Sequence, residues 1–296
     1  MKITSVRLNA AAKINLTLDI TGVRDDGYHM LRSVMQTISV YDTVDIKATN
    51  TGMIDLKVNL PFIPCDSRNT CYKAAQLYFE ACGMEIPGVE ISIYKTIPSS
   101  AGMGGGSADA AAVLRGLEYI YGKCPGDIYK IAERIGADVP FCLAGGTKLC
   151  EGIGEILTPI NIKPYKTRNI HLVVAKNARG LSTPQIFSLY DSFDTSSVVH
   201  PDSEKLIAAL RTGDPHQVAA NIGNVLEAVS VTERPEIAEL IDEIKLCGAL
   251  NSIMTGSGAA VFGIFDDFGK ARRCVVHLRK KGIYADYAKF VTTPGI

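Results

Sequence analysis

The stretch Pro98-Ser99-Ser100-Ala101-Gly102-Met103-Gly104-Gly105-Gly106-Ser107 places four glycines within five positions. The strand-like residues 89–94 precede it, and residues 108–121, rich in alanine and leucine, follow it as a predicted helix. Glycines allow a backbone to approach phosphate groups, and the free N–H groups of a first helical turn bind anions. The stretch therefore predicts a polyphosphate site, and a ligand-free glycine turn is the alternative.

The glycine loop matches none of three common nucleotide-binding motifs. A Walker loop requires a lysine after Gly106, and a dinucleotide fingerprint would require a third glycine at Ser107. A protein-kinase loop requires an HRD segment, which the chain lacks. The DFG letters at 267–269 are then a chance match. The loop belongs to another class of anion-binding turn.

Three further segments bring together residue types that carry chemistry. Lys13 lies among the strand-like residues 11–16, where it either points into a site or lies on the solvated face. Asp138 lies in the turn 136–140, where it is either functional or bonded to its own backbone. Residues 255–259 form a second glycine-rich turn, which alone would be an ordinary hairpin. Each segment alone is weak evidence for a functional site, and the prediction rests on their occurrence together in one chain.

Composition excludes several classes of protein. The 296 residues are enough for two modest domains, and 31 basic against 31 acidic side chains argue against a nucleic-acid coat but not against a small anionic ligand. The eight cysteines and five histidines have no metal-ligand spacing, so we expect structural thiols in a reducing compartment. No signal peptide and no run of about 20 apolar residues is found, which predicts a cytoplasmic protein without a membrane partner.

Strands and helices are mixed without a regular βαβ alternation, which predicts an α+β protein. Residues 158–169 contain two prolines and are expected to form a hinge between domains 1–160 and 161–296. The expected strands are 3–8, 14–20, 40–48, 54–60, 89–94, 170–175, 251–255, 260–265 and 284–290. The expected helices are 70–82, 108–121, 128–135, 185–191, 203–211, 215–222, 235–247 and 268–281.

The order of an amino-terminal strand motif, a glycine loop and a carboxy-terminal glycine turn resembles the GHMP small-molecule kinases over nearly the whole chain. The resemblance implies a ribosomal-protein-S5-like amino-terminal domain that binds ATP and carries catalysis, and a ferredoxin-like carboxy-terminal domain. Two positions depart from the family pattern. Met103 replaces the commoner leucine, and Ala108 replaces a second serine, so that Ser107 is left as the hydroxyl at this helix start.

Three short segments narrow the resemblance within the family. They are residues 12–16 (AKINL), 26–29 (DGYH) and 136–141 (GADVPF). They imply phosphorylation of the 2-hydroxyl of the small molecule 4-diphosphocytidyl-2-C-methyl-D-erythritol, with ATP and Mg²⁺, in non-mevalonate isoprenoid and terpenoid precursor biosynthesis. A mevalonate- or homoserine-type kinase and a non-catalytic ligand sensor on the same scaffold are the alternatives. A nucleic-acid partner is not expected, and monomer and homodimer both stay open.

The resemblance also implies roles for individual residues. Asp138 would be the general base, with Lys13 beside it acting on the base or on the transferring phosphoryl group. Substrate contacts would come from Asn15 at the sugar-alcohol end and from residues around the cytosine, namely Tyr28, His29, Thr183 and Phe187. ATP contacts would come from Lys95 near the base and from the glycine loop and its flank, namely Pro98, Gly102, Met103, Gly104, Gly105, Gly106 and Ser107. No protein metal ligand is expected.

Overall fold

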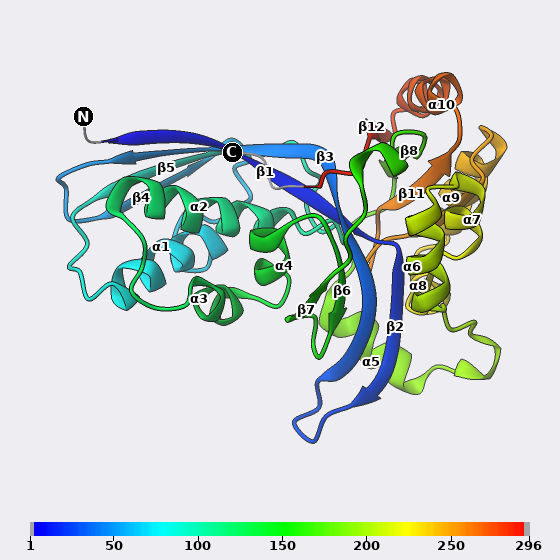
Figure 1. The fold of residues 1–296 in the computed structure, drawn as a ribbon, viewed down its shortest axis with the longest axis horizontal. Coiled ribbons are helices and arrows are strands. Elements are labelled where there is room, and N and C mark those ends of the chain that lie inside the picture. Colours follow the sequence, from blue (N-terminus) through cyan, green and yellow to red (C-terminus); the bar gives the residue numbers. More distant parts are fainter. Residues whose placement is uncertain (1–2, 293–296) are drawn as a thin grey trace.

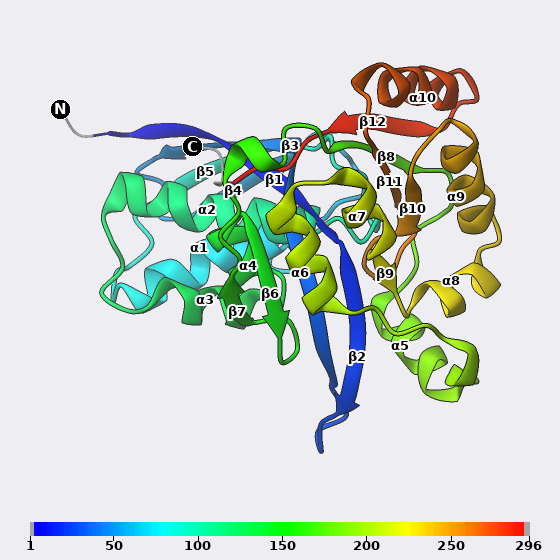
Figure 2. The ribbon, with the colours of Figure 1, turned by 45° about the vertical axis from the view of Figure 1, so that its right-hand side comes forward.

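The computed structural model describes residues 3–292 and confirms an α+β protein (Figures 1 and 2). Its strands are β1 (Ser5–Asn15), β2 (Thr17–Val23), β3 (His29–Ala48), β4 (Ile54–Val58), β5 (Val89–Tyr94), β6 (Thr147–Glu151), β7 (Ile156–Pro159), β8 (His171–Lys176), β9 (Gly223–Asn224), β10 (Asn251–Met254), β11 (Val261–Phe265) and β12 (Tyr284–Ala288). Its helices are α1 (Thr70–Ala81), α2 (Gly105–Tyr121), α3 (Ile128–Ile135), α4 (Val139–Ala144), α5 (Thr183–Ser192), α6 (Ser203–Thr212), α7 (Pro215–Ala220), α8 (Glu227–Glu233), α9 (Glu236–Leu246) and α10 (Phe268–Lys280), with 3₁₀ turns at Pro164–Lys166 and Thr195–Ser197.

Strand β3 organises the larger sheet, because β1, β2, β5 and β6 all pair with it antiparallel. Sequence patterning predicted only its second part, residues 40–48. There buried and half-buried residues alternate, whereas residues 33–38 are all buried. A strand covered on both faces has no period-two pattern to detect. The strands β6, β7 and β9 and the helices α4 and α8 were also not expected.

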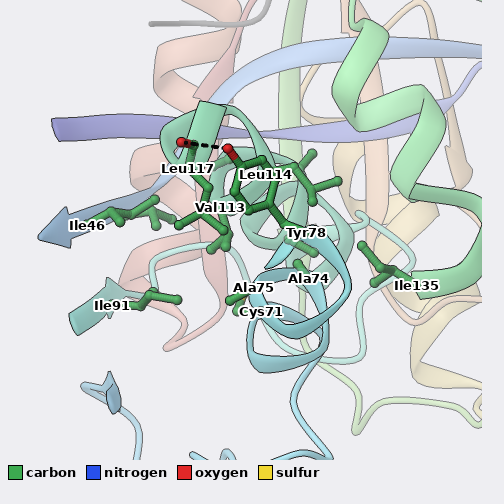
Figure 3. Packing of buried hydrophobic residues seen from close by; sticks show 14 of the residues in the cluster. Ile46, Cys71, Ala74, Ala75, Tyr78, Ile91, Val113, Leu114, Leu117 and Ile135 are labelled. Atoms are coloured by element: carbon green, nitrogen blue, oxygen red, sulfur yellow. Dashed lines mark hydrogen bonds between the residues drawn. The ribbon is translucent and has the colours of Figure 1, made fainter. Parts of the chain in front are cut away.

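Helices α1, α2 and α3 cover one face of the β1, β3, β4 and β5 part of this sheet (Figure 1). Helices α1 and α2 pack closely. The Tyr78 hydroxyl of α1 donates to the Gly122 carbonyl at the end of α2 at 2.6 Å and also lies 3.3 Å from the Leu117 carbonyl (Figure 3). Gly116 allows α2 to approach β3, because a Cβ there would lie 2.3 Å from the Ile46 side chain. This packing fixes the start of α2, and with it the glycine loop, against the sheet.

The second half is built on a four-stranded antiparallel sheet in the order β10-β11-β8-β12. Alternate residues of β8 enter different cores, as expected for a strand. Val173 and Ala175 join the core with α9 and α10, whereas Leu172 and Val174 join a core that contains Ile14 of β1. The second of these cores thus includes residues from both halves of the chain. The division at residues 160/161 stays a prediction.

Two further expectations concern thiols and membranes. All eight cysteines are free, as expected of structural thiols. Within residues 3–292, no helix combines the length and the apolar character needed to cross a bilayer.

Candidate active site

A cavity of about 1070 Å³ brings together segments from both halves of the chain. It is lined by the end of β1, the turn into β3, the glycine loop, the start of α4, the helix α5 and the turn after β10. All of the predicted site residues line it: Lys13, Asn15, Tyr28, His29, Lys95, Pro98, Gly102, Met103, Gly104, Gly105, Gly106, Ser107, Asp138, Thr183 and Phe187. Residues 98–107 form one contiguous stretch, but no local spacing brings this stretch together with Lys13, Asp138 or Phe187.

The glycine loop is pressed between two neighbouring segments. Gly102 and Gly104 have φ values of +70° and +68°, a region that L-residues rarely adopt. A Cβ at Gly102 would lie 2.1 Å from the Thr255 carbonyl oxygen, and one at Gly104 would lie 2.9 Å from Lys13 Cγ. The loop is also tied to β1, because the Lys13 backbone N–H donates to the Met103 carbonyl at 3.0 Å. The glycine loop therefore packs directly against the second glycine-rich turn, residues 255–259, and against Lys13 of β1.

Lys13 and Asp138 lie next to each other in the lining of the cavity. The Lys13 ammonium nitrogen lies 3.4 Å from Asp138 Oδ2. Lys13 is only 4% exposed, so its alternative placement on a solvated face is wrong. Asp138 precedes α4, but its side chain makes no capping hydrogen bond, so the reading of a carboxylate bonded to its own turn is wrong as well. The side chain of Asp138 is 33% exposed, which leaves its carboxylate accessible from the cavity.

Asn15 lies beside this pair and is only 1% exposed. Its amide oxygen accepts a hydrogen bond from Lys13 Nζ at 2.7 Å, and its Nδ2 donates to Ser33 Oγ at 2.8 Å. Its backbone N–H donates to Thr255 Oγ1 at 3.0 Å. Asn15 thus holds the lysine ammonium in place and connects β1 to the second glycine turn. Its predicted contact with the sugar-alcohol end of a substrate stays a prediction.

Lys95 is held by two carboxylates below the start of α2. Its ammonium forms ion pairs with Asp42 of β3 and Asp109 of α2. Asp42 is fully satisfied, because its other oxygen accepts from the backbone N–H of Ile97 at 2.8 Å and from that of Thr96. Burial, with a smaller contribution from the Asp42 carboxylate, raises the pKa of Asp109 to about 7 against the lowering effect of the Lys95 ammonium. No sequence motif marked either aspartate.

A second cluster occupies the other end of the cavity, where α5 lies beside the β2–β3 hairpin (Figures 1 and 2). The His29 ring stacks on the Phe187 ring at a centroid distance of 4.8 Å, and its Nε2 lies 2.7 Å from Asp191 Oδ1. Tyr28 is exposed at the rim. Thr183 Oγ1 lies 2.8 Å from Ser257 Oγ, which connects α5 to the second glycine turn. The sequence reasoning missed Asp191, although its position four residues after Phe187 predicts a shared helix face.

The loop between β4 and α1 forms a further wall that the sequence reasoning missed. Phe62 is largely exposed and lines the cavity, where its ring is accessible to a ligand. The same wall includes Ile63, Pro64, Arg68, Asn69 and Thr70. Thr70 also ties this wall to the glycine loop, because its hydroxyl donates to the Gly106 carbonyl at 3.0 Å.

Comparison with known proteins places these features in a family. The GHMP kinases N terminal domain matches residues 69–146, and the GHMP kinases C terminal domain matches residues 206–283. A 4-diphosphocytidyl-2-C-methyl-D-erythritol kinase of Clostridium botulinum (strain Alaska E43 / Type E3) is 42% identical over 277 residues, which cover 93% of this chain and 96% of that protein.

Solved structures agree with the sequence relatives. A crystal structure of 4-(cytidine 5'-diphospho)-2C-methyl-D-erythritol kinase superimposes with a TM-score of 0.80 at 31% identity, covering 96% of this chain and 99% of that one. A homoserine kinase from Cytophaga hutchinsonii superimposes with a TM-score of 0.76 at 16% identity, covering 99% and 97%. The second match shows a shared fold alone, so the fold by itself does not distinguish between these substrates.

Proposed function

This chain belongs to the GHMP kinase family, and from that premise we propose that it transfers the γ-phosphoryl group of ATP to the 2-hydroxyl of 4-diphosphocytidyl-2-C-methyl-D-erythritol. The chain is an ATP-dependent small-molecule kinase, as its relatives are. The observation that carries the choice of substrate is the cluster of His29, Phe187 and Asp191 in the same cavity as the pair Lys13 and Asp138. An aromatic and polar cluster of this kind suits a pyrimidine base.

Asp138 would accept the proton of the attacking hydroxyl. Phosphoryl transfer requires mainly positioning and charge stabilisation, with one group to receive that proton. The carboxylate borders the cavity, and its neighbour Lys13 is fixed by Asn15. The ammonium would orient the carboxylate and stabilise negative charge on the transferring group. The Lys13 ammonium could perform both functions, orienting the Asp138 carboxylate and stabilising the transferring group, from its place 3.4 Å from Asp138 Oδ2.

The glycine loop would surround the ATP phosphates. Helix α2 begins at Gly105, and the first three residues of the helix line the cavity. The backbone N–H groups of a first helical turn have no partner within the helix and can bind phosphate oxygens. The wall with Phe62 would contact the adenine, next to the backbone of Lys95. The ammonium of Lys95 is already bound by the carboxylates of Asp42 and Asp109. It would therefore contribute to the ATP site by holding these two side chains in place.

Mg²⁺ would accompany ATP, and the residues present suit it. The hydroxyl of Ser107 lines the cavity beside the glycine loop and is an oxygen donor, which Mg²⁺ prefers. Mg²⁺ usually keeps several waters and is bound mainly by substrate phosphates, so it would need few protein ligands here. When bound, the ion would neutralise phosphate charge.

A substrate panel tests the proposal. The purified protein with Mg²⁺ and ATP is offered 4-diphosphocytidyl-2-C-methyl-D-erythritol, mevalonate or homoserine, and the product is identified by ³¹P NMR. We expect a new phosphomonoester only with the cytidine compound. Phosphorylation of mevalonate or homoserine alone would overturn the choice of substrate, and absence of turnover with every acceptor would favour a ligand sensor.

A further inference from the structure

The His29 side chain is held on two sides by one turn of α5. It is only 10% exposed and lies at the cavity, although the chain around it is a surface hairpin. Phe187 packs against one face of the ring, at a centroid distance of 4.8 Å and an interplanar angle of 31°. Asp191 reaches the Nε2 edge of the same ring at 2.7 Å. The contact with Phe187 restricts the plane of the His29 ring, and the contact with Asp191 restricts which ring edge faces α5.

The hydrogen bond with Asp191 also fixes the location of the ring proton. An ionised carboxylate only accepts hydrogen bonds, so Nε2 must be the donor. In the neutral ring the other nitrogen, Nδ1, is then an acceptor. Among the hydrogen bonds of residues 3–292, none uses His29 Nδ1. The neutral ring thus offers one unused acceptor in a geometry that the protein has already fixed.

We infer that Asp191 is a positioning residue that makes His29 select cytosine against uracil, an inference that rests on the proposed function. Cytosine has an amine at C4, which donates to an acceptor such as Nδ1. Uracil has a carbonyl at the same place, which would face Nδ1 as a second acceptor. An unpaired polar contact of this kind costs enough to reduce kcat/KM roughly 10- to 100-fold. The discrimination depends on the tautomer, and the tautomer depends on Asp191.

The test compares wild type with Asp191→Ala and measures kcat/KM for the cytidine substrate and for its uridine counterpart. Asp191→Ala removes the acceptor at Nε2, so the ring can carry its proton on either nitrogen. We expect the cytidine-over-uridine preference to fall at least fivefold, while KM for ATP stays within twofold. The matched control is Asp242→Asn, which removes an exposed carboxylate on α9, away from the cavity lining. This control should keep the wild-type preference.

A second readout does not depend on catalysis. Two-bond ¹H–¹⁵N correlation spectra of ¹⁵N-histidine-labelled protein above pH 8, assigned with a His29→Gln variant, report which ring nitrogen carries the proton. We expect the Nε2–H form in wild type and a mixture of tautomers in Asp191→Ala. An Nδ1–H form in wild type, or an unchanged nucleotide preference in Asp191→Ala, would overturn the inference.

Failure of the proposed function gives a different pattern. If wild type phosphorylates neither nucleotide compound, that function is wrong, and the inference is then decided by titrating the protein with CMP and UMP. Preferential binding of CMP that is lost in Asp191→Ala supports the role of Asp191. Equal binding of CMP and UMP to wild type overturns it.

Discussion

Lys13 Nζ and Asp138 Oδ2 lie 3.4 Å apart, and the two side chains differ sharply in their environment. The lysine is buried and bound by Asn15, whereas a third of the aspartate side chain is open. The Lys13 ammonium, which must stay in place, is enclosed by protein, and the Asp138 carboxylate, which must accept a proton, is accessible from the cavity. This asymmetry is what a positioned general base requires.

Replacement of the proposed base should abolish most of the turnover without abolishing binding. We expect Asp138→Asn, and likewise Asp138→Ala, to reduce kcat about 10²- to 10⁴-fold, the usual contribution of acid–base catalysis. KM for ATP should change little, because the glycine loop is untouched. Steady-state kinetics and calorimetric titration with ATP measure both quantities. Turnover near the wild-type rate would show that another group takes the proton.

Asn15 has two competing roles that kinetics can separate. If it mainly holds the Lys13 ammonium, Asn15→Leu should lower kcat by about tenfold or more and change KM for the phosphoryl acceptor little. If it binds the sugar-alcohol end of the substrate, KM for the acceptor should rise instead. Ser33→Ala is the control, because it removes the acceptor of the hydrogen bond from Asn15 Nδ2 without touching Lys13. We expect that control to keep most of the wild-type kcat.

His29 should affect one substrate and not the other. His29→Ala removes the ring that contacts both Phe187 and Asp191, and we expect KM for the cytidine substrate to rise at least tenfold. KM for ATP should stay within a factor of about two, because the glycine loop and its wall lie on other segments of the chain. Equal increases in both KM values would indicate a general loss of structure, and circular dichroism of the variant checks for that loss.

Asp109 should make stability depend on pH in a defined direction. Burial raises its pKa from 3.8 to about 7, so between these values the folded protein keeps a proton that the unfolded chain has released. Its contribution to the free energy of unfolding is therefore intact below about pH 4 and is lost as the pH rises toward 7.

Asp109→Asn removes this titration. The free energy of unfolding of the variant minus that of wild type should rise by roughly 1–3 kcal/mol between pH 4 and 8. Urea denaturation at several pH values measures it, with Asp242→Asn as a control for the loss of one exposed carboxylate. A difference that stays constant over this range would contradict a proton held by Asp109.

Gly102 should be irreplaceable for steric reasons. A Cβ there would lie 2.1 Å from the backbone oxygen of Thr255, and φ is +70°. We expect Gly102→Ala to lower the free energy of unfolding by about 2–5 kcal/mol, through overpacking and the left-handed backbone together.

Two matched glycines separate these causes. Gly83 has φ of +61° and open space around it, and Gly126 has open space and no such φ. Gly83→Ala should cost about 1–2 kcal/mol, and Gly126→Ala should be close to neutral or stabilising. Denaturant unfolding of the three variants gives the comparison. A Gly102→Ala protein no less stable than Gly83→Ala would rule out the predicted clash.

Local sequence was sufficient for elements with one exposed face. The strand β5 and the helix α3 begin and end at the predicted residues, because their apolar periodicity and their flanking turns lie within a few positions. The glycine spacing also predicted the phosphate-type turn before α2, which begins three residues earlier than its alanine run indicated. Residues 33–38 escaped prediction because burial on both faces of β3 removes the alternation.

The sequence by itself thus determined the class of fold, the glycine loop and, through a resemblance, the identity of the candidate site residues. The resemblance implied that Lys13 lies beside Asp138, and the structure gives the distance of 3.4 Å between them. Only the tertiary structure revealed that two aspartates enclose Lys95 and that Asp191 contacts His29. The physical reason is that each pair joins segments far apart in the chain. Their distance is set by the packing of α2 and α5 against the sheets, and no local spacing records it.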